Sequence, residues 1–485
     1  MLSRKISLIL ILASLIGAMS CGGTQSEVET TSGDLPETTP KVTTNPYDEL
    51  GEYDFGGAEI VFDTRPMNAS SFINSTINVE SENGDVLNDS IYRRNRAVEE
   101  RFKLKILQVS TEGDRKAAAV SSILAGDDAF DVFLLTDRTA LTLAQDDMLV
   151  AYDSIKEIDL DKPYWSKTLN DSISIAGKHY FAYGDFELIP YDYTHMLLFS
   201  KKIADDNGFE SPYSLVKSGK WTLDTMSAMM KTATVDLNGD AKFDENDCYG
   251  YLAQSKQVLP GFWIGAGVES ISKDANDIPV CKLDSDARFS DVIDKVFSAV
   301  RKSGVWYEDL TIGNFETINR DMFTNGKGLF LDSTFYHITK LRDTDVDFGI
   351  LPYPKWDEAQ ESYYSRVEGG DFAMIPVTNK KLEMTGVVLE ALSSESMKTV
   401  IPAYYEKVLK GKITRDDESS EMLDIIYSSR VYDLGDTFWN PKLRDGIFKD
   451  MFDSGENNFA SAYASVKNSL ADDISSTVEA FRKLK

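Results

Sequence analysis

A run of oxygen-bearing side chains between residues 236 and 247 is the arrangement in this sequence that most directly suggests chemistry. Within twelve residues, Asp or Asn occupies positions 1, 3, 5, 9 and 12, and a backbone carbonyl can serve at position 7. Ca²⁺ binds six to eight oxygen ligands, and calcium-binding loops deliver them at this spacing. The pattern predicts a structural Ca²⁺ site whose ligands are Asp236, Asn238, Asp240, Lys242 (through its carbonyl), Asp244 and Asp247.

Two positions of this loop depart from the EF-hand pattern. Ala241 stands where the sharp turn favours Gly, and Asp247 stands where an EF-hand has Glu, although dockerin-type loops accept Asp there. The alternative is a solvated turn in which these side chains cap backbone N–H groups. Because the loop lies between a predicted helix and a predicted strand, a bound ion would be structural.

Motifs that would indicate an enzyme are missing from the sequence, which contains no GxSxG elbow, no HExxH and no P-loop. Its three histidines, His179, His195 and His337, leave little material for imidazole catalysis. The three cysteines form no CxxC or Cys/His cluster that could bind zinc. Cys248 and Cys281 could pair if their backbones approached each other, but we expect two free, partly buried thiols.

The composition indicates a folded and acidic protein. The chain has 485 residues, of which 42% are hydrophobic and 27% charged, as in globular proteins. Its 79 Asp and Glu residues exceed its 51 Lys and Arg residues, which gives a net charge of −28. A nucleic-acid-binding protein must neutralise phosphates, so we expect no nucleic acid among the partners.

Strand and helix patterns alternate from residue 56 onward. They predict strands at 58–62, 104–109 and 130–135, with helices at 87–102 and 114–125 between them. This order is typical of βαβ units, so we predict an α/β fold with a parallel sheet. Ligands of such sheets bind beyond the carboxyl ends of the strands. That rule selects Arg65 after the first strand, and Asp137 and Arg138 after the third.

The later part of the chain repeats this alternation and ends in a helix. Apolar residues between Phe459 and Phe481 recur every three or four positions, which predicts one buried helix face. The further predicted strands are 179–184, 196–200, 327–331, 348–352 and 372–376, and the further predicted helices are 201–207, 222–233 and 379–393.

The N-terminal residues have the pattern of an export signal. Arg4 and Lys5 precede an apolar run shorter than the ~20 residues of a membrane-spanning helix, so residues 1–20 are predicted to be a signal peptide. The segment ending at Cys21 resembles the bacterial lipobox, in which the cysteine is diacylated, although Ala18 stands where Leu is favoured. Ordinary secretion is the alternative. Residues 21–54, rich in Thr, Ser, Glu and Pro, are predicted to be a disordered linker. The protein would then be extracytoplasmic and attached to the membrane by lipid alone.

Several separated segments resemble one family. In their order along residues 56–485, they resemble the extracellular solute-binding proteins of carbohydrate ABC importers, the group that includes maltose-binding protein. The segments are Phe130–Phe133 with Thr136–Arg138, Leu149–Asp153, Gly177–Tyr183 with Met196–Lys201, Lys220–Thr222, Asn325–Phe330 and Phe348–Pro354.

This resemblance implies a two-lobed periplasmic-binding-protein-like fold with hinge crossings and a helical C-terminus. One lobe would comprise residues 55–184 and 371–401, and the other residues 185–370 and 402–485. It implies a monomeric receptor, not an enzyme, that delivers a carbohydrate to the permease subunits of an ABC importer. We expect that carbohydrate to be an oligosaccharide.

The resemblance also implies which residues contact the ligand. A sugar presents hydroxyl groups around an apolar ring face, so its site needs aromatic platforms together with carboxylates, amides and Arg. Core packing is the alternative for each aromatic residue, and a surface ion pair is the alternative for Asp137 with Arg138. The ligand-binding residues that the resemblance implies are Trp263, Trp439, Tyr336, Asp137 and Arg138. Further candidates, chosen for their positions in loops or at a strand end, are Arg65, Tyr193, Asp332, Glu368 and Asp371.

Two other functions stay open at this point. A secreted glycan-active hydrolase needs two carboxylates at a set separation, and 79 acidic residues cannot exclude such a pair. A receptor for a non-sugar solute such as a peptide would have a similar aromatic content. A receptor differs from an enzyme because its ligand stabilises it and is not consumed.

Overall fold

The computed structural model describes residues 49–67, 74–308, 315–341, 344–409 and 416–483. The predicted signal peptide, Cys21 and residues 21–48 of the predicted linker lie outside this part of the chain. Residues 49–54, the end of that linker, are described, and Leu50 is buried in the core, so the folded part begins before residue 55. Among the described residues, no helix is both long enough and apolar enough to cross a membrane.

The first of two five-stranded sheets contains the three strands predicted at the start of the folded part and one strand from much later in the chain. β1 runs parallel to β2 and to β3, whereas β13 runs antiparallel to β3 and β4. The sheet is therefore mixed, and the parallel prediction holds for its first three strands. In pairing order the strands are β2 (Leu104–Ser110), β1 (Ala58–Thr64), β3 (Val132–Thr136), β13 (Asp371–Pro376) and β4 (Leu149–Val150).

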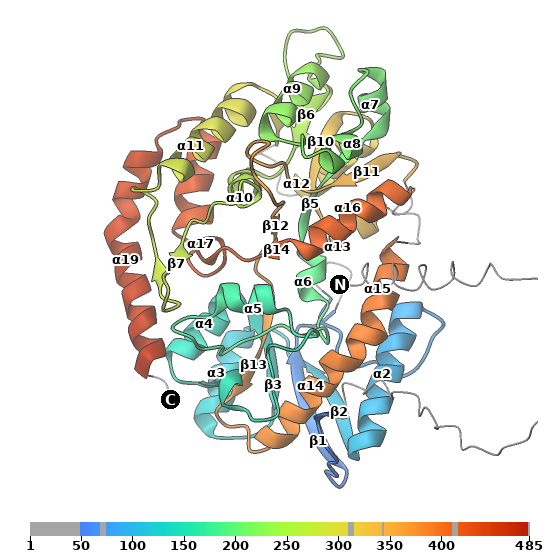
Figure 1. Ribbon diagram of the computed structural model, residues 1–485, viewed down its shortest axis with the longest axis vertical. Coiled ribbons are helices and arrows are strands. Elements are labelled where there is room, and N and C mark those ends of the chain that lie inside the picture. Colours follow the sequence, from blue (N-terminus) through green and yellow to red (C-terminus); the bar gives the residue numbers. More distant parts are fainter. Residues whose placement is uncertain (1–48, 68–73, 309–314, 342–343, 410–415, 484–485) are drawn as a thin grey trace, which may run out of the picture. The chain divides into compact units, whose positions relative to one another are not determined.

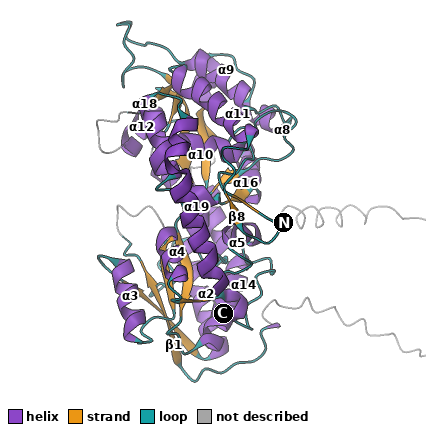
Figure 2. Cartoon of the chain, turned by 90° about the vertical axis from the view of Figure 1, so that its left-hand side faces the viewer, coloured by secondary structure: helices purple, strands orange, loops and turns teal. Residues whose placement is uncertain are grey.

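Helices cover both faces of this sheet, with α2 and α14 on one face and α3 on the other (Figures 1 and 2). Helix α2 (Val86–Phe102) begins where the Asp85 side chain accepts hydrogen bonds from two backbone N–H groups, and it buries the predicted apolar face. Helix α3 (Arg115–Ala125) ends at the predicted residue and is followed by Gly126 in a left-handed conformation. The other helices in this part are α4 (Asp137–Gln145), α5 (Lys167–Ile173), α14 (Leu382–Lys398) and α15 (Val400–Leu409).

The second sheet is formed by strands that lie between residues 195 and 351. β5 pairs antiparallel with β10 and β11, while β6 pairs parallel with β10 and β9. Gly250 in β6 lets the sheet approach helix α9 closely, because a Cβ at this position would lie 2.5 Å from the Cα of Met230. In pairing order the strands are β11 (Phe348–Leu351), β5 (His195–Ser200), β10 (Gly328–Thr334), β6 (Tyr249–Leu252) and β9 (Trp306–Tyr307).

The helices of this second part include the predicted helix after Trp221. Thr222 caps α9 (Leu223–Ala233) by accepting a hydrogen bond from the N–H of Thr225. The others are α6 (Ile189–Asp192), α7 (Lys201–Asp206), α8 (Pro212–Lys217), α10 (Ser255–Gly265), α11 (Ala287–Val296), α12 (Phe315–Thr324), α13 (Phe335–Ile338), α16 (Asp417–Ser428), α17 (Leu434–Thr437) and α18 (Lys449–Ser454), with π-helical turns η3 (Phe297–Lys302) and η5 (Leu443–Phe448).

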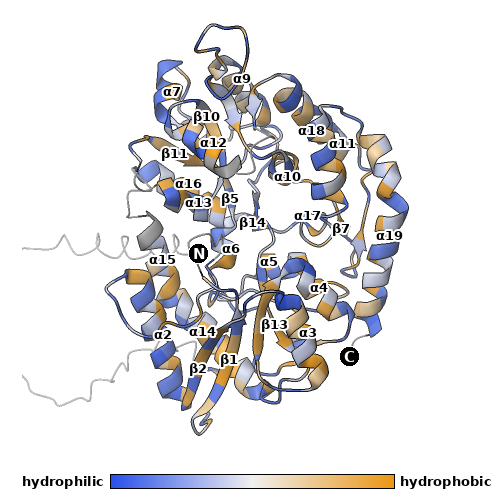
Figure 3. Ribbon diagram, turned by 180° about the vertical axis from the view of Figure 1, so that it is seen from behind, coloured by the Kyte–Doolittle hydropathy of each residue, from blue (hydrophilic) through white to orange (hydrophobic). Residues whose placement is uncertain are grey.

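The C-terminal helix α19 (Phe459–Lys483) confirms the predicted apolar stripe. Its buried side chains include Tyr463, Leu470 and Phe481, and the helix contacts both α4 and η5. Figure 3 shows the same pattern across the molecule, with hydrophobic residues concentrated in the strands and hydrophilic residues along the outer helices. Burial of one face therefore fixes α19 against the rest of the fold.

The chain passes between the two sheets several times. It leaves the first sheet after β4, enters the second at β5, and returns after β11 to form β13. The returning segment is tied to neighbouring backbone by β12 (Ser365–Arg366), which pairs with β14 (Arg430–Val431), and by a bridge between Thr194 and Val367. The described residues from 49 onward belong to one compact unit, and the predicted lobe boundaries stay a prediction.

The strand predicted at 179–184 is wrong. In the described structure this segment makes isolated bridges, including one between Ala182 and Ala373, instead of a ladder. Its apolar residues are buried by ring packing, because Phe181 lies against Phe372 and Phe438. A continuous apolar run is consistent with either kind of burial, and periodicity cannot separate them.

Candidate functional site

A cavity of about 250 Å³ lies at the carboxyl ends of β6 and β10 in the second sheet. β5 is antiparallel to β10, so its first residue, His195, lies beside Thr334 at the same edge. This is the position where open α/β sheets bind ligands. Most of the residues that line it have polar side chains; they are Tyr193, His195, Gln254, Lys256, Gln257, Asn319, Arg320, Leu331, Asp332, Ser333, Thr334, His337, Leu341 and Glu368.

Several elements position these side chains, in addition to β5, which supplies His195. Residues 331–334 form the end of β10, and residues 254–257 form the start of α10, directly after β6. Asn319 and Arg320 come from α12, and His337 comes from α13. Glu368 is supplied by the segment between β12 and β13 that returns to the first sheet. The cavity is therefore built by the second sheet and closed on one side by a crossing segment.

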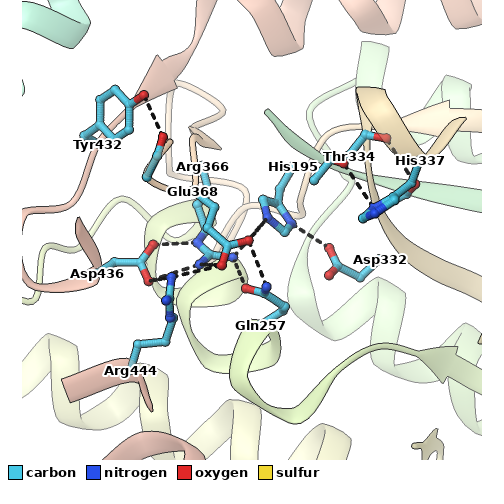
Figure 4. A network of polar contacts seen from close by, with 12 residues as sticks. His195, Gln257, Asp332, Thr334, His337, Arg366, Glu368, Tyr432, Asp436 and Arg444 are labelled. Atoms are coloured by element: carbon cyan, nitrogen blue, oxygen red, sulfur yellow. Dashed lines mark hydrogen bonds and ion pairs between the residues drawn. The ribbon is translucent and has the colours of Figure 1, made fainter. Parts of the chain in front are cut away.

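His195 joins the two carboxylates of the cavity. Its Nδ1 lies 3.0 Å from Asp332 Oδ1, and its Nε2 lies 3.1 Å from Glu368 Oε2 (Figure 4). Burial lowers the pKa of His195, but the neighbouring carboxylates raise it, and the net pKa lies above the usual value. Tyr353 donates a further hydrogen bond to Asp332 Oδ1 at 2.7 Å.

Two arginines hold Glu368 from the other side (Figure 4). Arg444 Nη1 donates to Glu368 Oε1 at 3.0 Å, and the fully buried Arg366 lies 3.8 Å from the same oxygen. Burial alone would raise the pKa of Glu368, but the charges of Arg366 and Arg444 bring it well below the usual value. Gln257 Nε2 donates to the second oxygen, Oε2, at 2.8 Å.

Arg366 is itself fixed by Asp436 on α17. Its Nε and Nη2 donate to the two carboxylate oxygens of Asp436 at 2.6 and 3.0 Å, a bidentate pair in which both residues are fully buried. Its Nη1 donates to Gln257 Oε1 at 2.5 Å. The network thus connects the crossing segment, α10, α17 and η5, and it sets the wall of the cavity.

Sequence reasoning found part of this site. The predicted residues Tyr193, Asp332 and Glu368 all line the cavity. Tyr336 is half-buried beside it, with its ring 4.9 Å from the Lys340 ammonium group, but it is not a lining residue. The prediction missed the residues that join these groups, namely His195, Gln257, Arg366, Asp436 and Arg444.

The expected tryptophan platforms are not supported, because both rings lie in the core. Trp263 is fully buried on α10, with its ring centre 4.9 Å from that of Phe448 and 5.6 Å from that of Phe289. Trp439 is 4% exposed and packs edge-on against Phe438. Neither lines the cavity. Packing in the core is the more frequent environment of such large aromatic side chains.

The predicted residues of the first sheet gather at its carboxyl edge, away from the cavity lining. Arg65 donates from Nε and Nη2 to the two oxygens of Asp371 at 2.8 and 2.5 Å, and Arg115 pairs with the same carboxylate at 3.2 Å. Asp137 is buried, and burial raises its pKa to about 7 despite a hydrogen bond from the backbone N–H of Arg138. The Arg138 side chain is exposed.

The predicted calcium loop forms a series of capped turns. Asp236 accepts from the N–H groups of Gly239 and Ala241, and Asp247 accepts from those of Leu237 and Asp244. Ala241 has a φ of +64°, the left-handed conformation for which that turn favours Gly. Within the described residues, no three acidic, His or Cys side chains are arranged to hold a metal ion. Calcium binding by Asp236, Asn238, Asp240, Lys242, Asp244 and Asp247 stays a prediction.

The two cysteines in the described part are free, as expected. Cys248 is buried, and burial raises the pKa of its thiol to about 11. Cys281 lies 3.3 Å from the hydroxyl of Tyr463. No disulfide therefore contributes to the site.

No protein-family model matches the chain, and no curated protein matches it. Solved structures do match. A sugar transporter of Rhizobium etli in an open conformation aligns with a TM-score of 0.58 and 10% identity over 88% of this chain and 100% of that one. A Listeria monocytogenes ABC substrate-binding protein in complex with cycloalternan aligns with a TM-score of 0.55 and 13% identity, over 86% of this chain and 99% of that one. A cyclo/maltodextrin-binding protein complexed with maltotetraose aligns with a TM-score of 0.55 and 12% identity, over 88% of this chain and 97% of that one.

At such low identity, this likeness shows the fold. The chain has the two-sheet α/β fold of the ABC sugar-binding proteins, with a helical C-terminus, and the predicted fold class is confirmed. Two of these matched proteins are named as binding proteins and the third as a sugar transporter. What this chain binds is a separate question, because unrelated functions share folds.

Proposed function

We propose that the protein is an extracytoplasmic receptor that binds a carbohydrate and presents it to an ABC importer. The observation that carries this proposal is the polar cavity at the carboxyl ends of β6 and β10, in a fold that solved sugar-binding proteins share. Amide and hydroxyl side chains on its wall can both donate to and accept from sugar hydroxyls. Leu331, Leu341 and the ring of Tyr193 supply the apolar surface that a sugar ring face requires.

The cavity size favours one sugar unit as the enclosed part of the ligand. Its volume of about 250 Å³ is below the ~300–1,000 Å³ of pockets that enclose drug-sized molecules. An oligosaccharide would place one residue in the cavity and extend the others beyond it. A ligand that contacts segments from both sheets would favour the conformation in which those segments are close together.

The charged groups of the cavity support binding without catalysis. A glycosidase needs one carboxylic acid with a raised pKa beside a second carboxylate. Here the two arginines keep the pKa of Glu368 well below its usual value, and Asp332 is held by His195 and Tyr353. Asp137 has a raised pKa but does not line the cavity. Glu368 is therefore unsuited to be the acid that the hydrolase alternative requires.

Membrane attachment through Cys21 and docking on permease subunits complete the proposal. The lipid anchor rests on the sequence, because Cys21 lies outside the described residues, and permease docking rests on the resemblance to receptors of ABC importers. We propose a monomeric receptor, as the resemblance to solute-binding proteins implies.

A direct test is a thermal-shift screen of the mature chain against neutral and acidic mono- and oligosaccharides and against short peptides. The proposal expects a saccharide to raise the melting temperature by mass action and to be recovered unchanged by chromatography. Stabilisation by peptides alone would favour the non-sugar receptor. Disappearance of the added saccharide with appearance of products would favour the hydrolase.

A further inference from the structure

The cavity wall carries two cationic side chains whose charge is not neutralised. Within the described structure, the ammonium group of Lys256 makes no ion pair or hydrogen bond, and Lys256 is half-buried at the start of α10. Among the side chains that the structure describes, the guanidinium of Arg320 has one charged neighbour, the adjacent Asp321 at 3.7 Å, whose side chain is 61% exposed. An ion pair of this kind is weak and is screened by solvent.

The carboxylates of the wall cannot balance these charges, because both are already engaged. Asp332 is bound by His195 and Tyr353. Glu368 is bound by His195, Gln257 and Arg444. Both carboxylates therefore make their hydrogen bonds and ion pairs within the protein, and neither pairs with Lys256 or Arg320.

One further carboxyl group lies near the start of α10. Glu308 accepts a hydrogen bond from the backbone N–H of Ser255 at 2.5 Å, so it caps the helix, and burial raises the pKa of its carboxyl group to about 7. Glu308 does not line the cavity. The positive character of the wall thus rests on the side chains of Lys256 and Arg320.

A third group in the cavity lacks a partner. Asn319 is 3% exposed, and in the described structure its Oδ1 accepts no hydrogen bond. A buried acceptor without a donor is unfavourable, and a ligand hydroxyl can satisfy it. Asn319 and Arg320 are adjacent on α12, so one ligand could donate a hydroxyl hydrogen bond to Asn319 and place an anionic group against Arg320.

We infer that the cavity receives a sugar residue with an anionic substituent, held by Lys256 and Arg320 while one of its hydroxyls donates to Asn319 Oδ1. This inference rests on the proposed carbohydrate-binding function. Arg presents a planar pair of donors that matches a carboxylate, so a uronic acid residue is the form we favour. A sulfate or phosphate ester shares the negative charge and is separated from a uronate by the test.

The net charge of the chain makes this local arrangement more informative. A protein with a net charge of −28 repels anions at long range. The positive charge of Lys256 and Arg320 in the cavity is therefore opposite in sign to the net charge of the chain. They would give short-range selectivity, which salt screens less than it screens exposed charges.

The test is isothermal titration of the full chain with four pairs of probes. D-galacturonate is compared with D-galactose, D-glucuronate with D-glucose, and D-glucose with its 6-sulfate and its 6-phosphate. We expect at least one acidic sugar to bind about tenfold or more tightly than its neutral partner, as expected for charge-assisted hydrogen bonds.

Variants locate the effect. Lys256→Gln and Arg320→Gln should each weaken binding of the acidic sugar about tenfold and weaken binding of its neutral partner by a smaller factor. Asn319→Ala should weaken both kinds of sugar and cost no stability, because its Oδ1 has no internal hydrogen bond to lose. The matched control is Lys231→Gln, an exposed lysine on α9 outside the cavity, which should change neither.

The outcomes separate this inference from the proposed function. Equal or tighter binding of the neutral sugars would overturn the inference and leave the carbohydrate receptor standing. Absence of binding by every sugar, neutral or anionic, would overturn the proposed function as well. Preference for the sulfate or phosphate ester over both uronates would keep the anionic site and reject the carboxylate. Acidic preference that survives both Gln substitutions would reject the assigned residues.

Discussion

Replacement of Arg366 by Met tests the buried ionic network at the cavity wall. Arg366 donates to Asp436 at 2.6 and 3.0 Å, and both residues are fully buried. The substitution leaves Asp436 with one long contact from Arg444, at 3.4 Å, and removes a donor from Gln257. Loss of one partner of a buried pair costs roughly 3–5 kcal/mol, because the remaining charge is uncompensated. We therefore expect Arg366→Met to lower the free energy of unfolding by about 4 kcal/mol.

The double variant Arg366→Met with Asp436→Leu should recover most of this loss. Replacement of a whole buried ion pair by apolar residues of similar volume is often neutral, because both desolvation penalties disappear together. The assay is urea unfolding followed by far-ultraviolet circular dichroism, with the free energy of unfolding taken from the midpoint and slope. The matched control is Lys202→Met, which breaks an exposed pair with Asp206 at 2.6 Å and should cost less than ~1 kcal/mol.

The reasoning would be refuted if Arg366→Met cost no more than the Lys202 control. It would also be refuted if the double variant lost the sum of the two single losses, because the pair would then contribute as two independent residues. Since Arg366 also holds Gln257 and lies beside Glu368, the single variant should weaken ligand binding together with stability.

The other predictions concern pH, calcium and packing. Because the pKa of Asp137 is raised to about 7, the folded state holds a proton between pH ~4 and ~7 that the unfolded state has released. This residue should therefore make stability fall as pH rises through that window, by at most about 4 kcal/mol. Asp137→Asn should reduce the slope in urea titrations at successive pH values, while Asp185, Glu308 and Asp433, whose pKa values burial also raises, keep the remainder. Ca²⁺ should raise the melting temperature and EDTA should reverse the shift, whereas Asp240→Asn, which keeps an oxygen to accept from the Lys242 N–H at 2.8 Å, should abolish it; a calcium-blind melting curve would support the solvated turn. Gly250→Ala should cost about 1–3 kcal/mol through overpacking against Met230, and an unchanged unfolding midpoint would contradict that contact.

The sequence predicted the elements that depend on local patterns. The strands β1, β2, β5, β10 and β13 and the helices α2, α3, α9 and α19 lie where alternation, caps and apolar stripes indicated. These features arise from residues close together in the chain, so they can be read without knowing the topology. The failure at 179–184 has the opposite cause, because its burial comes from rings that are distant in sequence.

The site was harder to predict than the fold. Glu368 and Asp332 were found from their positions in loops and at strand ends. Arg366 and Asp436 pair across 70 residues, and His195 reaches Glu368 across 173 residues, so no local spacing relates these groups. Trp263 shows the converse error, since an aromatic residue at an expected position can still be a core residue.

Equilibrium dialysis of the mature chain against a mixture of neutral and acidic oligosaccharides of known composition, followed by chromatography of the retained fraction, tests the central claim most directly. We predict that one class of oligosaccharide is retained in about a one-to-one ratio with the protein and is recovered intact. Retention of no saccharide, or recovery of shorter products, would contradict a receptor that binds carbohydrate without altering it.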